Sequence, residues 1–181
     1  MNCPAPDGSF SSKHFHVLRY YSLLHSIVHS DLTTVLTAPP NSTHLQPSLR
    51  LLLAGCLEGP DMQLQRQCFA ILQRLVEAWI PEVAGFDTFV LQEVLPVCFQ
   101  APGRPHFNLK DAASLPLLEA SASLQKAMLA KLSTVFISVL RDQLLPSLGC
   151  GAEFANEYTR LLCDGTTVQL RDFLKLQMAQ R

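Results

Sequence analysis

One segment, residues 60–80, limits the possible folds more than any other part of the chain. It opens with Pro60-Asp61, and the Asp61 carboxylate can accept hydrogen bonds from the free N–H groups of a first helical turn. Pro81 then ends the helix, because proline has no backbone donor. Between these signals, apolar residues recur at steps of three and four and form one thick stripe: Leu64, Cys68, Phe69, Ile71, Leu72, Leu75, Val76 and Trp79. Such a stripe predicts a helix that packs between other helices, with Leu64, Phe69, Leu72, Leu75 and Trp79 pointing inward.

The remaining sequence shows more helical periodicity and no convincing strand, because no segment sustains a period of two with β-branched residues. Prolines and glycines predict breaks at 37–47, 103–108 and 149–153. We expect residues 1–12 to be disordered, and Pro96 to kink the last turn of its helix. The helical pattern after Lys110 is too long for one ordinary helix, so we divide it near residue 122. The predicted helices cover residues 12–36, 48–59, 61–80, 85–102, 109–121, 123–145, 153–163 and 166–179.

A weak internal repeat indicates how these helices are arranged. Two of them end on a Leu-Pro step, Leu95-Pro96 and Leu145-Pro146, and the two steps lie 50 residues apart. Armadillo and HEAT repeats have periods of about 40–47 residues, close to this spacing. Helix pairs that cannot bury their apolar stripes alone stack and share one long core. We therefore expect residues 13–181 to form an all-α fold, a HEAT-repeat-type α-α superhelix.

Composition excludes several classes of protein. Hydrophobic residues make up 48% of the 181 residues and charged residues only 16%, so much of the surface is buried or meets a partner. The net charge of −1 lacks the excess of Lys and Arg that non-specific nucleic-acid binding needs. Six cysteines without a C-x-x-C pair are typical of reduced thiols in the nucleus or cytosol. We expect a soluble chain with no secretory signal and no membrane insertion, since its strongly apolar runs fall short of a span.

The sequence contains no convincing catalytic, cofactor-binding or metal-binding motif. His25 and His29 have the i, i+4 spacing of metal ligands but lack a third ligand, so we interpret them as exposed histidines on a helix face. The Gly149-Cys150-Gly151 run is not a phosphate loop, because it lacks the G-K-[ST] end and a preceding strand. No local signature surrounds any cysteine as a nucleophile. We therefore predict a protein that is not an enzyme and needs no cofactor.

Two groups of basic residues are candidates for contact with RNA phosphates. Arg104 and Lys110 flank one loop together with His106, and Arg171 and Lys175 lie in the last helix with Arg181. Phosphate contacts need positive charge and no base reading. The alternative is that they are ordinary solvated residues, and Lys175 also suits the dipole at a helix C-terminus. Arg104, Lys110, Arg171 and Lys175 are the predicted phosphate contacts.

Several short motifs follow one another in a fixed order: Pro60-Asp61, Cys68-Phe69, the run Leu75-Val76-Glu77 with Trp79, Gly85-Phe86, Pro96 with Cys98-Phe99, Ala101-Pro102, and Phe107 with Leu109. This ordered set resembles the C-terminal region of the exportin-T family. The resemblance spans about residues 14–181 and is strongest over 60–111. The closing segments 144–149 and 170–181 also resemble the last two helices of the family.

This resemblance implies a HEAT-repeat solenoid of the importin-β superfamily without a catalytic site. It implies a receptor that binds tRNA together with the GTP form of the small GTPase Ran, passes nuclear pore proteins, and shuttles between nucleus and cytoplasm. Family members are several times longer, and their Ran-binding repeats are missing here, so we expect a fragment holding the last repeats. Residues 1–12 match nothing in the family.

The sequence leaves two alternative functions open. A generic HEAT or armadillo scaffold would bind a peptide or a protein and would not respond to RNA. An enzyme would need a deep pocket lined by polar groups with perturbed pKa values, for which a Leu-rich solenoid offers no natural place.

Overall fold

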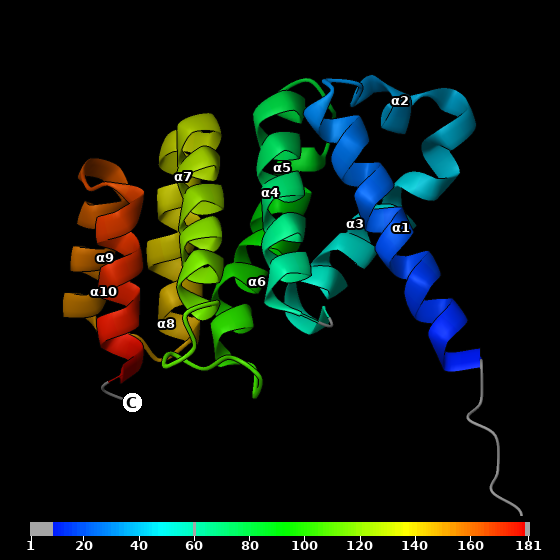
Figure 1. Cartoon of the computed structure of the whole chain (residues 1–181). Helices are drawn as coiled ribbons and strands as arrows, with labels where there is room; N and C mark the ends of the chain where they lie inside the picture. The colour runs from blue at the N-terminus through cyan, green and yellow to red at the C-terminus, as the bar shows by residue number, and fades with distance from the viewer. Residues whose placement is uncertain (1–8, 60, 180–181) are drawn as a thin grey trace, which may run out of the picture.

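The computed structural model describes residues 9–59 and 61–179, which form a row of packed helices (Figure 1). No strand occurs among these residues, so the all-α prediction is confirmed. Residues 1–8 of the segment predicted to be disordered lie outside the description, and the first helix begins at Ser9. The longer elements are α1 (Ser9–His29), α3 (Ser42–Glu58), α4 (Met62–Trp79), α7 (Ser114–Val139), α9 (Ala152–Asp164) and α10 (Thr167–Ala179).

The central helix α4 forms as its sequence predicts. The Asp61 carboxylate accepts a hydrogen bond from Leu64 N at 2.7 Å, which caps the first turn. The whole apolar stripe is buried, and all five residues predicted to point inward are at most 5% exposed. α4 packs against α1, α3 and α7, so it is a layer within a stack and not a surface helix.

The N-terminal helices begin and end at other residues than predicted. The helix expected over 12–36 is two helices, because the chain turns at Asp31 with φ 56° before α2 (Thr34–Thr37). A 3-10 turn, η1 (Pro39–Asn41), then leads into α3, which begins six residues earlier than expected and contains Pro47. Pro47 lies in the second turn of α3, where it removes one intrahelical hydrogen bond, and the helix continues past it to Glu58.

Both repeated Leu-Pro steps, Leu95-Pro96 and Leu145-Pro146, follow a π-helical turn. The π turn η2 (Val90–Val94) joins α5 (Phe86–Phe89) to α6 (Leu95–Gln100), and η4 (Leu140–Leu144) joins α7 to α8 (Leu145–Ser147). A proline ring crowds the carbonyl four residues before it, and a wider turn relieves that crowding. The irregularity expected at Pro96 therefore precedes the proline, and the last turn continues into the 3-10 turn η3 (Ala101–Gly103).

The long helical segment is divided at Ser133 and not near residue 122. Ser133 has φ 48° and ψ −121°, so α7 consists of two arms, and the second arm runs back beside the first (Figure 1). The predicted break was wrong because Ala122 and Leu124 are buried in the middle of the first arm. Residues 109–113 form turns and not helix, since the Asp111 side chain accepts a hydrogen bond from Ala113 N at 2.9 Å.

The helices form two rows that share one core. In Figure 1, α4, the first arm of α7 and α10 form one row, and α6, the second arm with α8, and α9 lie behind it. α7 contacts α4 and α10 within the first row, and its first arm also contacts α6 and α9 of the row behind. Residues far apart in the sequence, such as Phe69, Leu118 and Tyr158, are fully buried. The packed helices are consistent with the HEAT-type fragment that the sequence predicts.

The helical segment 114–147 has the length and the apolar composition of a membrane span, with a mean hydropathy of 1.2. This judgement uses length and composition alone. The turn at Ser133 divides this segment, and buried residues of both arms, such as Leu124 and Phe136, belong to the shared core. We therefore treat it as core helix of the stack.

Candidate nucleic-acid interface

The two predicted basic groups lie on different elements that flank one cavity. Arg104 and Lys110 belong to the segment between η3 and α7, whereas Arg171 and Lys175 are one turn apart on α10. Gly103 and Leu174, which precede Arg104 and Lys175 in the chain, line the same cavity of about 300 Å³. The segment that ends at Arg104 and the helix that carries Lys175 therefore meet at one hollow.

Arg104 is paired with a carboxylate from another helix. Its Nη2 lies 3.4 Å from Glu58 Oε1 at the end of α3. Its Nε is buried without a hydrogen-bond partner. The neighbouring His106 ring is 2.7 Å from Gln65 Nε2 on α4, so this loop is anchored to the helical stack. A phosphate at Arg104 would compete with Glu58 for this guanidinium.

Arg171 is the more strongly paired arginine. Its Nη1 lies 2.8 Å from Glu119 Oε2 on α7, and its Nη2 lies 2.7 Å from Asp172 Oδ1. Hydrogen bonds to Asp172 and Glu119 raise the pKa of Arg171 above its ordinary value. The side chain is only 20% exposed, so Arg171 joins α10 to α7 and has little surface left for RNA.

Lys110 and Lys175 have the opposite character. Both side chains are exposed, and neither ammonium group makes an ion pair or hydrogen bond within the part of the chain that the structure describes. Arg50 and Arg66 share this property, although sequence reasoning does not single them out. These four residues are the cations that could reach a phosphate without breaking a described contact.

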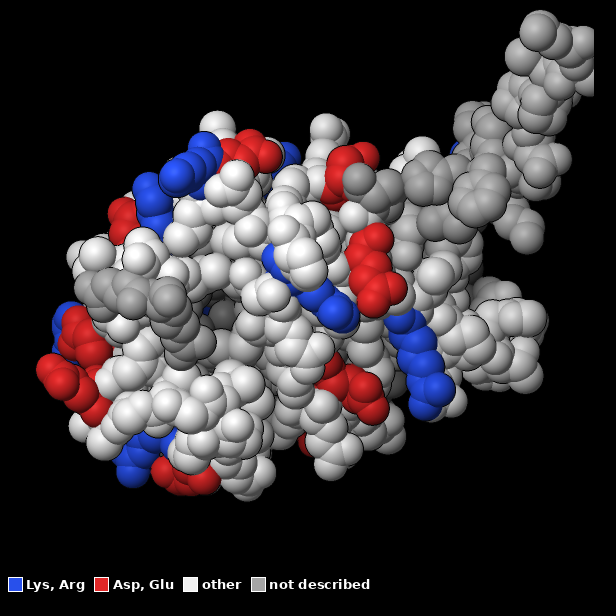
Figure 2. Space-filling view, turned by 90° about the horizontal axis from the view of Figure 1, so that it is seen from below, with Lys and Arg blue, Asp and Glu red and all other residues white. Residues whose placement is uncertain are grey.

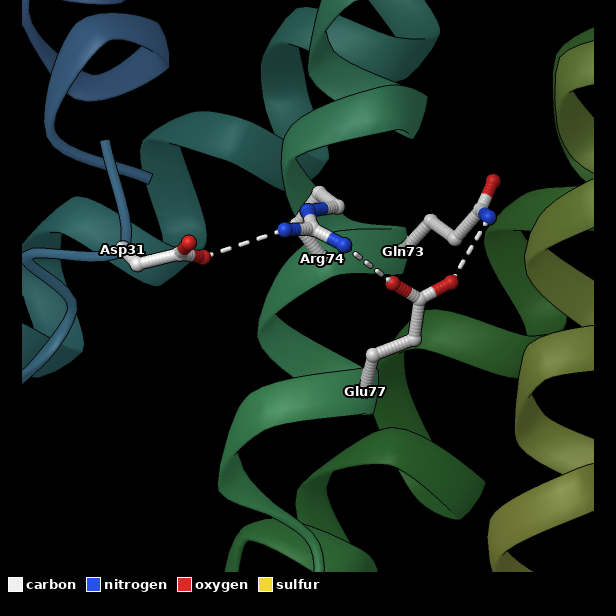
Figure 3. Close-up of polar contacts among 4 residues, drawn as sticks. All are labelled: Asp31, Gln73, Arg74 and Glu77. Carbon is white, nitrogen blue, oxygen red and sulfur yellow. Dashed lines mark hydrogen bonds and ion pairs between the residues drawn. The ribbon is translucent and has the colours of Figure 1, made fainter. Parts of the chain in front are cut away.

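Most other described cations are paired with carboxylates. Figure 2 shows Lys and Arg side chains scattered among Asp and Glu on one face, with white surface between them and no continuous positive patch on that face. Figure 3 shows one network, in which Arg74 lies 3.1 Å from Asp31 and 3.0 Å from Glu77. Gln73 donates to the same Glu77 at 2.8 Å. This network ties the turn after α1 to α4.

Two lysines that sequence reasoning misses serve as helix caps. Lys126 Nζ donates to Leu162 O at 2.8 Å and to Gly165 O at 2.6 Å, at the C-terminal end of α9. Lys131 Nζ donates to Ile80 O at 3.1 Å, at the end of α4. Positive charge is favourable at a helix C-terminus. No signal in the sequence reveals these contacts, because their partners are 35 to 51 residues away.

The described histidines and cysteines do not gather into a metal site. The His25 and His29 rings face each other at 4.0 Å between centroids, and burial and then His29 lower the pKa of His25. No group of three possible metal ligands comes together among the described residues. Burial raises the pKa of Cys98 to about 12, so its thiol stays protonated and is a poor nucleophile.

Comparison with known proteins identifies the family. A model of the exportin-T family matches residues 16–181. Proteins named exportin-T are 28% identical over 170 residues in Dictyostelium discoideum, 29% over 159 in Homo sapiens and 30% over 164 in Danio rerio. These alignments cover 90%, 87% and 89% of this chain, which spans only about a sixth of the length of these relatives. No solved structure is significantly similar to the chain. Since the family model covers nearly all of its length, the chain belongs to the exportin-T family.

Proposed function

We propose that the chain is part of a tRNA export receptor and corresponds to its C-terminal helical repeats. The receptor carries tRNA from nucleus to cytoplasm in a complex with the GTP form of Ran, past nuclear pore proteins, and it contacts Ran through regions outside this chain. The family match over residues 16–181 is the observation that carries this proposal. The stacked helices also support it, because such a fold offers a long surface for a large cargo.

Within this proposal, Lys110 and Lys175 are the phosphate contacts of the segment. Their exposed ammonium groups can approach RNA without losing a described partner. At Arg104 a phosphate competes with Glu58, and at Arg171 it competes with Glu119 and Asp172. We therefore rank the two lysines above the two arginines.

Filter binding of labelled tRNA to the full-length gene product, with and without Ran-GTP, tests the function. We expect tight binding only with Ran-GTP, and affinity that falls steeply as salt rises. Absence of tRNA binding in the presence of Ran-GTP would overturn the proposed receptor function.

Single substitutions test the phosphate contacts separately. Lys110→Ala and Lys175→Ala should each weaken binding of all tRNAs alike and reduce the slope of log K against log salt by about 0.7–0.9. Arg141→Ala is the matched control, since Arg141 is exposed but paired with Asp142 at 3.2 Å. If the salt slopes of both lysine variants equal that of Arg141→Ala, neither lysine contacts RNA. That result would not contradict the proposed receptor function.

A protein-interaction scaffold is the second candidate function. It is favoured by an open groove of about 570 Å³ between successive helices, lined by uncharged residues that include Thr88, Gln92, Gln143 and Ser147. Such a groove offers amide and hydroxyl groups for a peptide but no charge for RNA. A scaffold would show no change in binding on addition of tRNA, which the same filter-binding experiment detects.

A further inference from the structure

The cavity lined by Gly103 and Leu174 is largely apolar, and six segments of the chain, α7 among them, build its walls. It has a volume of about 300 Å³, within the range of small-molecule sites. α6, η3, the segment after α8, α9 and α10 contribute the apolar lining, which includes Phe99, Pro102, Leu148, Phe154, Leu174 and Met178. These residues do not take part in the proposed phosphate contacts.

Two polar side chains, Gln125 of α7 and the half-buried Gln177 of α10, interrupt this apolar lining. Gln125, in the first arm of α7, lines the cavity and is fully buried. Its Oε1 accepts a hydrogen bond from the Tyr158 hydroxyl, which fixes the amide. Its Nε2 has no hydrogen-bond partner. A buried amide N–H without a partner costs free energy, so a ligand that supplies an acceptor gains from this group.

The aromatic side chains at the cavity favour a flat ligand. Phe99 and Phe154 both line the cavity, and both contact Tyr158 with ring centroids 5.6 Å apart. Aromatic rings prefer other rings at such distances, in stacked or tilted arrangements. Water is a poor occupant, because a buried water usually makes about three hydrogen bonds and the mainly apolar walls offer few partners.

We propose that this cavity binds a small aromatic molecule, whose ring lies against Phe99 and Phe154 and whose carbonyl oxygen accepts a hydrogen bond from Gln125 Nε2. The apolar walls bury the ring, and the fixed amide of Gln125 makes the site prefer ligands that carry a hydrogen-bond acceptor. This site is independent of tRNA and Ran.

Two probes of nearly equal shape test the proposal. Acetophenone carries the carbonyl oxygen, and α-methylstyrene has a CH₂ group in its place. Titration of the ¹⁵N-labelled chain, followed by NMR, reports the Kd of each probe and the side-chain amide of Gln125 directly. We expect acetophenone to bind about 2- to 10-fold more tightly, the range for one net hydrogen bond. The Gln125 side-chain amide proton should move further downfield with acetophenone than with α-methylstyrene, because only acetophenone accepts its hydrogen bond.

Variants test the role of each group. Tyr158→Phe keeps the amide donor, so the preference for acetophenone should remain. Gln125→Met combined with Tyr158→Phe removes donor and hydroxyl together and leaves no stranded polar atom, so both probes should bind alike. Leu174→Trp fills the cavity and should abolish binding of both probes.

Equal affinity of the two probes for the unmodified chain, or no binding of either up to its solubility, would overturn the proposal. A preference that survives in the double variant would also overturn it. The comparison on the unmodified chain decides the matter even if a variant fails to fold.

Discussion

Replacing Lys126 by Met should destabilise the chain, because the Lys126 ammonium closes the C-terminal end of α9. It donates to Leu162 O at 2.8 Å and to Gly165 O at 2.6 Å. The last carbonyls of a helix have no intrahelical donor and lie at the negative end of its dipole. A hydrogen bond to a charged group contributes about 1.5–3 kcal/mol to stability. In the variant, water can hydrogen-bond to the freed carbonyls and recover part of this free energy, because Lys126 is only half-buried. We therefore expect a loss of about 2 kcal/mol, with the Met side chain keeping the packing of the aliphatic stem.

Thermal and urea unfolding measure this loss. For a chain of 181 residues, about 2 kcal/mol corresponds to a fall in Tm of roughly 4–8 °C. Lys175→Met is the matched control, since it removes the same charge from an exposed position and should change the free energy of unfolding by no more than about 0.5 kcal/mol. Equal effects of the two substitutions would refute the distinction between capping and free lysines.

Three further predictions test the fold. A Cβ at Gly55 would lie 2.5 Å from Cys68 Sγ, so Gly55→Ala should cost about 1–3 kcal/mol in urea unfolding despite its helix propensity. Cys68→Ala should recover part of that loss, and a stabilising Gly55→Ala would contradict the close approach of α3 and α4. Ser133→Gly should stabilise the chain by about 1 kcal/mol, because glycine tolerates φ 48°, and a lower Tm would argue against the turn. Burial and His29 lower the pKa of His25, so the folded state binds fewer protons than the unfolded state, and stability should fall as pH drops through the ordinary histidine value of 6.5. This fall in the urea midpoint should be smaller in His25→Gln, and equal pH profiles would exclude the mechanism.

The sequence predicts those elements whose signals are local. The Asp61 cap and the apolar stripe of α4 lie within one segment, and the structure confirms both. The repeated Leu-Pro steps at Pro96 and Pro146 mark two irregular turns, although the sequence does not show that these turns are π-helical. Ser133 could not be found this way, because serine carries no preference for a positive φ and the helical pattern continues on both sides of it.

The charges of the candidate interface depend on contacts between distant residues. Glu58 lies 46 residues from Arg104, and Glu119 lies 52 residues from Arg171. Composition and spacing therefore identify where basic residues gather but not which of them are already paired. The cavity lined by Gly103 and Leu174 cannot be predicted from the sequence either, since six separate segments build it.

Thermodynamic coupling between tRNA and Ran-GTP is the sharpest test of the proposed receptor function. In the full-length gene product, the Kd for Ran-GTP is measured by fluorescence titration with and without saturating tRNA, and the Kd for tRNA with and without Ran-GTP. A receptor that holds both in one complex must show the same factor in both directions, and coupling of this kind is typically about 5- to 150-fold. Equal affinities for Ran-GTP with and without tRNA would contradict the account.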